Sequence, residues 1–101
     1  MSHVMPAEHI VIVTFHPRPE HEETFHDAML SVRRDLPTVQ GCNGVQVFRH
    51  HSDRAKYTLV ESWQDQQSHS DHIDQFIASG AWKNLEEMLF EAPSTSFLSP
   101  A

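Results

Sequence analysis

The sequence predicts an α+β domain in which an antiparallel sheet carries helices on one face. Three short segments are rich in β-branched and aromatic residues, as strands are. The segments between and after them repeat apolar residues every three or four positions, which is the period of a buried helix face. With a short final strand, the order β-α-β-β-α-β is that of a ferredoxin-like unit. We expect a single domain over residues 1–101, with residues 1–7 as a flexible N-terminal segment.

The first strand is expected at His9–Phe15, a β-branched run that two prolines terminate. Pro19 suits the first position of a helix, because its missing N–H costs nothing there. The apolar stripe of this helix comprises Phe25, Ala28, Met29, Val32 and Leu36. Pro37 ends the helix, and Gly41 and Gly44 mark the turn that follows.

A hairpin is expected next. A second strand from Val45 to about His51 and a third from Lys56 to Trp63 are joined by a short turn at 52–54. Because successive side chains of a strand point to opposite faces, each residue of the third strand can be assigned to one face of the sheet.

Two helical segments complete the chain. Asp65 fits the N-cap of a helix that ends at Ser79, before Gly80. A third helical piece carries the apolar residues Trp82, Leu85, Met88 and Leu89. A short last strand is expected at 96–98.

Both faces of the predicted sheet are apolar, and helices can cover only one of them. Along the first strand both alternating sets are apolar, with Ile10 and Ile12 on one side and Val11, Val13 and Phe15 on the other. The third strand also places Val60 opposite Leu59 and Trp63. We therefore expect a homodimer that packs sheet against sheet, with an obligate interface of roughly 2,000 Å² or more.

Composition excludes several classes of protein. The formal net charge of −7 argues against a nucleic-acid partner, because no basic stripe is present to neutralise phosphates. No apolar run reaches the roughly 20 residues of a membrane span. Cys42 is the one cysteine, so no internal disulfide can form, and the N-terminal residues lack the pattern of a secretion signal. A cytoplasmic location is the expectation.

The candidate site lies where the third strand meets the helix after it. Strand alternation puts Tyr57, Leu59, Glu61 and Trp63 on one face, and helical spacing puts His69 and His72 on the same side as Phe76. An imidazole facing the sheet could accept the proton of a phenolic substrate near neutral pH. The alternative is a histidine at the edge of the apolar stripe, bonded to water or to backbone.

Each of the other candidates also has a structural alternative. Trp63, Glu61 and Tyr57 could form an aromatic wall with one polar group, as in pockets for flat ligands. Equally, Trp63 could be a core residue, and Glu61 could be solvated or bonded to backbone.

A metal site is not expected, although the chain has nine histidines. His21 and His26 are five residues apart, which separates them by roughly 140° around a helix. His69 and His72 could share an ion, yet no third ligand is evident. No nucleophile elbow, phosphate-binding loop or dinucleotide fingerprint is present.

Two stretches of sequence resemble the antibiotic biosynthesis monooxygenase family. They are Val-Glu-Ser-Trp-Gln-Asp at 60–65 and Phe-Ile-Ala-Ser-Gly-Ala-Trp at 76–82. The resemblance implies a ferredoxin-like protomer that dimerises into a two-sheet α+β barrel. It also implies oxidation of phenols, quinols or anthrone-like polycycles by O₂, with no metal, flavin or nicotinamide cofactor.

The resemblance also suggests roles for individual residues. Trp63 matches the family tryptophan, and His72 matches the family histidine when counted from Glu61. Counted back from the glycine turn, the position of the family histidine falls on Phe76 instead. The segment between Glu61 and that turn is therefore one helical turn longer than is usual in the family. We therefore expect His72 to be the catalytic residue, as a base or a hydrogen-bond partner. Substrate contacts are expected from Trp63, Phe76, Glu61, His69 and Tyr57.

Other activities occur among proteins of this fold. A haem-degrading branch of the family uses an asparagine on the first strand, a tryptophan on the second helix and a histidine after it. Here the first strand has no asparagine, Phe76 stands at the tryptophan position and no histidine follows His72, so haem degradation is not expected. Two alternatives stay open: a ligand-binding or stress-related protein without catalysis, and an isomerase of a small carbonyl compound.

Overall fold

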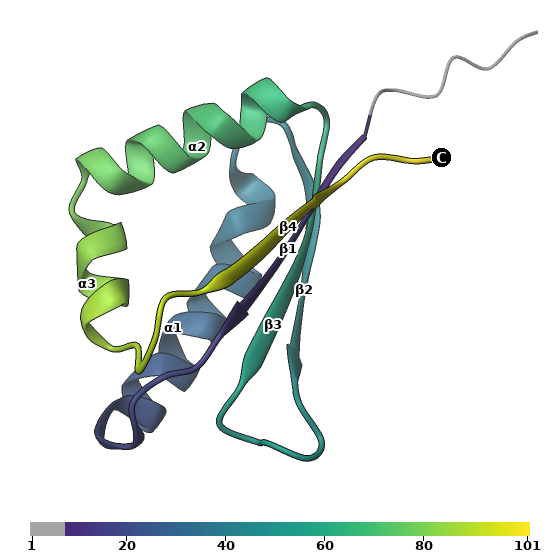
Figure 1. Ribbon diagram of the computed structural model, residues 1–101. Helices are drawn as coiled ribbons and strands as arrows, with labels where there is room; N and C mark the ends of the chain where they lie inside the picture. The colour runs from purple at the N-terminus through teal and green to yellow at the C-terminus, as the bar shows by residue number, and fades with distance from the viewer. Residues whose placement is uncertain (1–7) are drawn as a thin grey trace, which may run out of the picture.

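The computed structural model describes residues 8–101, so the segment expected to be flexible at 1–7 lies outside the described residues. Four strands form one antiparallel sheet in the order β2-β3-β1-β4, and the helices pack on one of its faces (Figure 1). The α+β, ferredoxin-like prediction is confirmed. The elements are β1 (His9–Phe15), α1 (Glu22–Asp35), β2 (Cys42–Arg49), β3 (Tyr57–Trp63), α2 (Gln66–Ala78), α3 (Ala81–Glu87) and β4 (Ser94–Leu98).

Several predicted boundaries shift. Pro19 begins a 3-10 turn, Pro19–His21, and the α-helix proper begins at Glu22. β2 starts at Cys42 and ends at Arg49, short of the expected His51. β4 begins at Ser94, before the predicted 96–98, because its polar residues pair with β1 without any apolar alternation to reveal them.

Three contacts hold the start of α2 in place. The Asp65 carboxylate accepts the backbone N–H of Ser68 at 2.8 Å, which confirms the predicted N-cap. Gly41, with φ of +87°, lies so close to Ser68 that an added Cβ would collide with the serine side chain. The Gly41 carbonyl also accepts the N–H of Gln64 at 2.7 Å. These contacts set the position of the first turn of α2, which carries His69.

Side chains alternate between buried and half-buried along β1 and β3, as period-two strands with one covered face do. The main core cluster joins the covered face to α1 and α3 and consists of Val13, Phe15, Phe25, Met29, Tyr57, Leu59, Leu85 and Leu89. A second, smaller cluster surrounds Trp63, with Val11 and Leu36.

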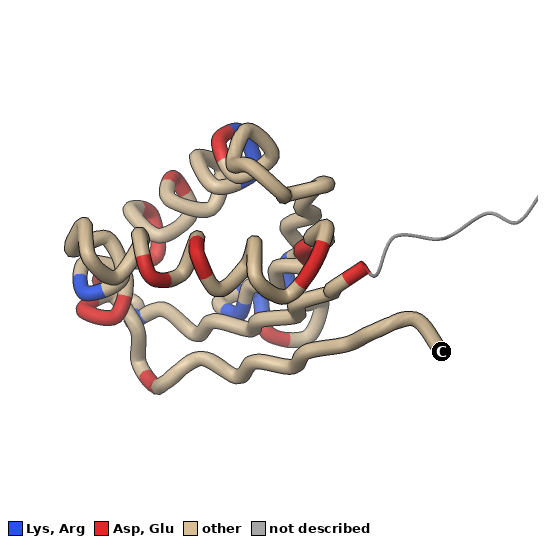
Figure 2. The backbone as a smooth tube through the Cα atoms, turned by 90° about the horizontal axis from the view of Figure 1, so that it is seen from above, with Lys and Arg blue, Asp and Glu red and all other residues tan. Residues whose placement is uncertain are grey.

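The other face of the sheet, which we call the rear face, is left uncovered by the helices (Figure 1). Ile10, Ile12 and Val60 are half-buried there, and Phe48 and Leu98 are 48% and 46% exposed. Figure 2 shows that acidic and basic residues are concentrated outside the strands. Within the strands only Arg49 and Glu61 are formally charged, and the pairing of each strand turns both toward the helices. The strands therefore place no Asp, Glu, Lys or Arg on the rear face.

Threonine hydroxyls form a polar strip at one end of the rear face. The Thr14 and Thr58 hydroxyls are 2.8 Å apart, and Nε2 of His50 lies 2.7 Å from the Thr58 hydroxyl. No helix in the part of the chain that the structure describes is long and apolar enough to cross a membrane.

Candidate functional site

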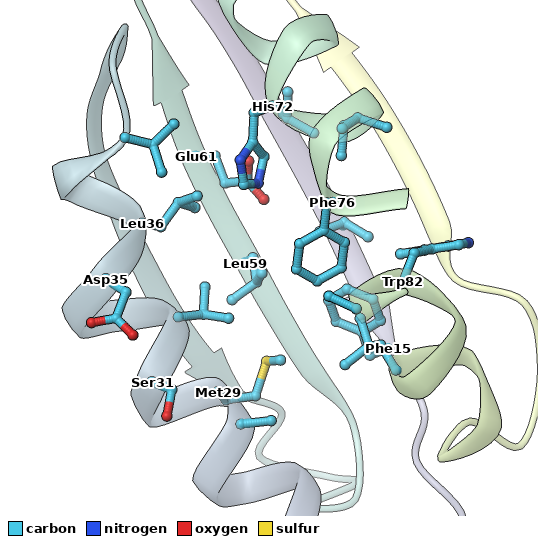
Figure 3. Close-up of a pocket in the computed structure, with 18 of the residues that line it drawn as sticks. Phe15, Met29, Ser31, Asp35, Leu36, Leu59, Glu61, His72, Phe76 and Trp82 are labelled. Carbon is cyan, nitrogen blue, oxygen red and sulfur yellow. The ribbon is translucent and has the colours of Figure 1, made fainter. Parts of the chain in front are cut away.

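A cavity of about 740 Å³ lies between α1 on one side, α2 and α3 on the other, and β1 and β3 beneath (Figure 3). Its volume falls within the range of small-molecule sites. Most of its surface is apolar, with Val11, Phe15, Leu36, Leu59, Phe76 and Trp82 among the lining residues. From α2 the cavity is lined by His69, His72, Ile73 and Phe76.

Glu61 is the buried carboxylate of the cavity. Its side chain is only 7% exposed, and one carboxylate oxygen accepts the indole N–H of Trp63 at 2.9 Å. Burial raises the pKa of Glu61, and the hydrogen bond from Trp63 opposes this shift only in part. Glu61 therefore holds a proton more readily than a carboxylate in water.

His72 comes from α2 and faces the same end of the cavity as Glu61 (Figure 3). Its ring centroid lies 5.3 Å from that of Trp63 and 5.8 Å from that of Phe76. Burial lowers the pKa of His72, so the imidazole is neutral near pH 7 and can accept a proton. The structure thus brings together His72, Phe76 and Glu61, as the sequence predicted.

His69 also lines the cavity, one helical turn before His72. It is 7% exposed, and its ring centroid lies 5.4 Å from that of Trp63. Burial lowers its pKa to about 4, and the neighbouring His9 and His72 imidazoles add to the shift. We call Glu61, His69 and His72 the polar end of the cavity.

Two predicted contact residues do not line the cavity. Trp63 is fully buried and is not part of the lining, but its indole N–H donates the hydrogen bond that holds Glu61 at the polar end. Tyr57 lies at the opposite end of β3, where its hydroxyl is 2.7 Å from Nδ1 of His26 and the Arg49 guanidinium stacks over its ring. Both share a strand face with Glu61, but strand alternation does not reveal which residues pack above that face.

The sequence analysis overlooked the contribution of α1. Ala28, Ser31, Val32 and Asp35 line the cavity from that helix, at the spacing of a single helix face. Asn84 of α3 lines it as well. The three- and four-residue spacing of these residues would have predicted this wall if Ser31 and Asp35 had been considered together with the apolar stripe of the helix.

Comparison with known families gives a direct assignment. The family model described as antibiotic biosynthesis monooxygenase matches residues 9–78, which is most of the chain. The chain belongs to the antibiotic biosynthesis monooxygenase family. A comparison with curated proteins finds no significant match.

Solved structures of other members and relatives share the fold. A conserved protein from Methanosarcina mazei is 19% identical, with a TM-score of 0.81 and 92% of each chain covered. Rv0793 from Mycobacterium tuberculosis is 16% identical, with a TM-score of 0.82 and coverage of 93% of this chain and 95% of that chain. A proposed antibiotic biosynthesis monooxygenase from Bordetella bronchiseptica is 23% identical, with a TM-score of 0.76 and coverage of 94% and 98%. At these identities the likeness establishes the fold.

Within residues 8–101 no group of three or more His, Cys, Asp and Glu side chains is placed to hold a metal ion. The polar end places two imidazoles of lowered pKa beside a carboxyl group of raised pKa. Such opposed shifts are typical of sites that move protons.

We predict that His69 makes the protein less stable in mild acid. The folded state keeps His69 uncharged down to about pH 4, whereas the unfolded chain takes up that proton near pH 6.5. The unfolded state thus binds more protons between these values, and the free energy of unfolding rises with pH. Urea unfolding between pH 4.5 and 7.5 should show that His69→Asn reduces this slope, by up to about 1.4 kcal/mol per pH unit.

Glu61 changes this slope in the opposite direction, because its raised pKa favours the folded state in acid. Wild type and His69→Asn both contain Glu61, so its effect cancels when their slopes are compared. His51→Asn is the matched control, because His51 is exposed. Equal slopes in wild type and His69→Asn, or an equal reduction in His51→Asn, would contradict the assignment.

Proposed function

We propose that this protein is a cofactor-independent monooxygenase that oxidises a quinol, polyphenol or anthrone-like aromatic with O₂. The observation that supports the proposal most strongly is a neutral imidazole, His72, facing an apolar cavity large enough for a fused-ring aromatic. Membership in the antibiotic biosynthesis monooxygenase family supports the same reaction class.

The reaction begins with a proton transfer. The phenolic O–H bond of the substrate breaks as an N–H bond forms on His72, leaving an electron-rich phenolate. The phenolate gives electrons to O₂, and one oxygen atom bonds to a ring carbon. An anthrone presents the phenolic O–H as its enol tautomer, and its methylene carbon becomes a carbonyl. The proton held by His72 passes to the second oxygen, which leaves as water with the remaining hydrogen of that carbon. The substrate supplies all four electrons, so the balance requires no other reductant.

The remaining residues of the site orient the substrate and exclude water. Phe76 and Trp82 lie on the α2–α3 side of the cavity, where they can stack on a planar ring (Figure 3). Glu61, held by Trp63, offers a second polar contact to a ring hydroxyl. The apolar lining shields the reactive phenolate from solvent, which limits side reactions.

We further propose that two copies pack through their rear faces. This face carries no Asp, Glu, Lys or Arg, and it leaves Phe48 and Leu98 half exposed in a single copy. An uncharged, partly apolar sheet surface is the composition that an obligate homodimer buries.

We predict that His72→Phe lowers the rate of O₂ consumption at least about 100-fold with hydroquinone or anthrone substrates, because the proton acceptor is lost. Phenylalanine keeps a ring beside Trp63 and Phe76, so the shape of the cavity is retained. Gln75→Ala is the control, since Gln75 is exposed on the same helix. The measurement is oxygen-electrode uptake, corrected for spontaneous oxidation.

No wild-type uptake above the spontaneous rate with the whole substrate panel would contradict the enzymatic proposal. If the same compounds still quenched tryptophan fluorescence under anaerobic conditions, the ligand-binding alternative would be favoured. A His72→Phe rate equal to that of Gln75→Ala would remove His72 as the base.

We predict that Val60→Lys converts the protein to a monomer, because it places a charge at the centre of the rear face. Light scattering after size exclusion should give twice the 11.6 kDa chain mass for wild type and the single mass for the variant. Ile77→Lys, at an exposed apolar position on α2, should remain dimeric. A monomeric wild type at micromolar concentration would refute the dimer.

A further inference from the structure

A second, smaller space adjoins the cavity at His69, and we call it the side pocket. Its volume is about 210 Å³, which is several times the roughly 30 Å³ that one water molecule occupies in the liquid. His69, Ile73 and Phe97 line both the cavity and the side pocket, so these three side chains form the partition between the two spaces. Of the three, His69 alone has a polar side chain.

The side pocket joins solvent to buried imidazoles. Gln66, Ser70 and Asp74 line it at intervals of four residues along one face of α2, and all three are exposed. His9 and His69 line it as well, and they are only 8% and 7% exposed. The side pocket is therefore open to solvent along α2 and ends at two imidazoles.

His9 is held at this inner end by aromatic contacts. Its ring stacks on that of Phe97, with centroids 5.5 Å apart, and lies 5.7 Å from the ring of His69. Within residues 8–101, Nε2 of His9 is the one buried side-chain nitrogen or oxygen without a hydrogen-bond partner. A buried polar atom without a partner is costly, and ordered water commonly supplies the missing hydrogen bond. The side pocket is the polar space that His9 borders.

His69 separates the side pocket from the polar end of the cavity. Its ring centroid lies 5.4 Å from that of Trp63, whose indole N–H donates to Glu61. A buried water needs two to four polar partners, and the cavity lining away from the polar end is mostly apolar. The side pocket, with its exposed polar residues and two imidazoles, is therefore the more favourable route for water toward the polar end.

We propose that the side pocket holds water, and that His69 relays protons between this water and the polar end of the cavity. A neutral imidazole has one ring nitrogen that carries a proton and one that accepts. As the accepting nitrogen takes up a proton from one side, the other nitrogen releases its own proton to the opposite side. One N–H bond forms and one breaks, so the ring stays neutral. Burial lowers the pKa of His69 to about 4, so the imidazole passes the proton on and does not keep it.

The use of this relay rests on the proposed function. An aromatic substrate that fills the cavity displaces water from it, so His72 and Glu61 then face the substrate and the protein. Through His69 and the side pocket, these two groups can still exchange protons with solvent. They can thus return to the protonation state that the pH of the solvent sets before the next turnover begins.

The test measures how fast deuterium from the solvent reaches the polar end of the ligand-free protein. The reporter is the indole N–H of Trp63, which donates to Glu61, and its exchange in D₂O is followed by NMR. Ser70→Leu places an apolar side chain in the side pocket, and His69→Gln keeps a polar side chain but removes the imidazole. Each should slow the exchange about 3- to 10-fold, because the indole then exchanges mainly through local opening of the fold.

Gln75→Leu is the matched control, because Gln75 is exposed on α2 and lines neither space, so this variant should exchange at the wild-type rate. A substitution that only loosened the fold would speed the exchange, so slowing distinguishes the relay from structural damage. Wild type should also show magnetisation transfer between water and the ring protons of His69, and Ser70→Leu should lose it.

The outcomes separate this proposal from the proposed function. Slower exchange in Ser70→Leu and His69→Gln, in a protein that consumes no O₂ with any substrate, would support the relay and refute the monooxygenase. Substrate oxidation by wild type, with equal exchange rates in these two variants and Gln75→Leu, would refute the relay alone. Slowing in Ser70→Leu but not in His69→Gln, or no water contact at His69 in wild type, would also overturn the relay.

Discussion

The candidate site depends on the alternation of side chains along β3. This strand turns Leu59, Glu61 and Trp63 toward the helices, and a shift of one residue would turn all three outward. Burial of an indole N–H and a carboxylate on the same face is costly unless each finds a partner. Here each is the partner of the other, at 2.9 Å, so the strand fixes the carboxyl group at one end of the cavity.

The helices turn this fixed end into a cavity. α1 packs tightly through the fully buried Phe25 and Met29, whereas α2 buries only His69. The contact of Gly41 with Ser68 keeps the first turn of α2 on the sheet, which holds the imidazoles beside Trp63. The space along the rest of α2 and α3 is left open to a ligand. Burial then sets the proton affinities, lowering the pKa of both histidines and raising that of Glu61.

Sequence reasoning predicted the parts of this arrangement that local periodicity controls. The alternation of β3, the Asp65 cap and the shared face of His72 and Phe76 all follow from spacing within one element. What spacing could not reveal is which element lies over each residue. Tyr57 shares the face of Glu61 yet packs beside His26, and α1 supplies a wall of the cavity that depends on where that helix crosses the sheet. The polar strand β4 gave no periodic signal because pairing with β1 alone defines it.

The central claim is that His72 takes a proton from a phenol bound in the cavity. Its most direct test is an NMR titration of the protein with 2,4-dinitrophenol, a nitrophenol acidic enough to protonate an imidazole of lowered pKa and not oxidised by O₂. We predict that the side-chain resonances of His72 move toward those of a protonated imidazole as the absorbance of bound nitrophenolate appears. Binding of the nitrophenol with His72 resonances unchanged, or with the shifts confined to residues outside the cavity, would contradict the claim.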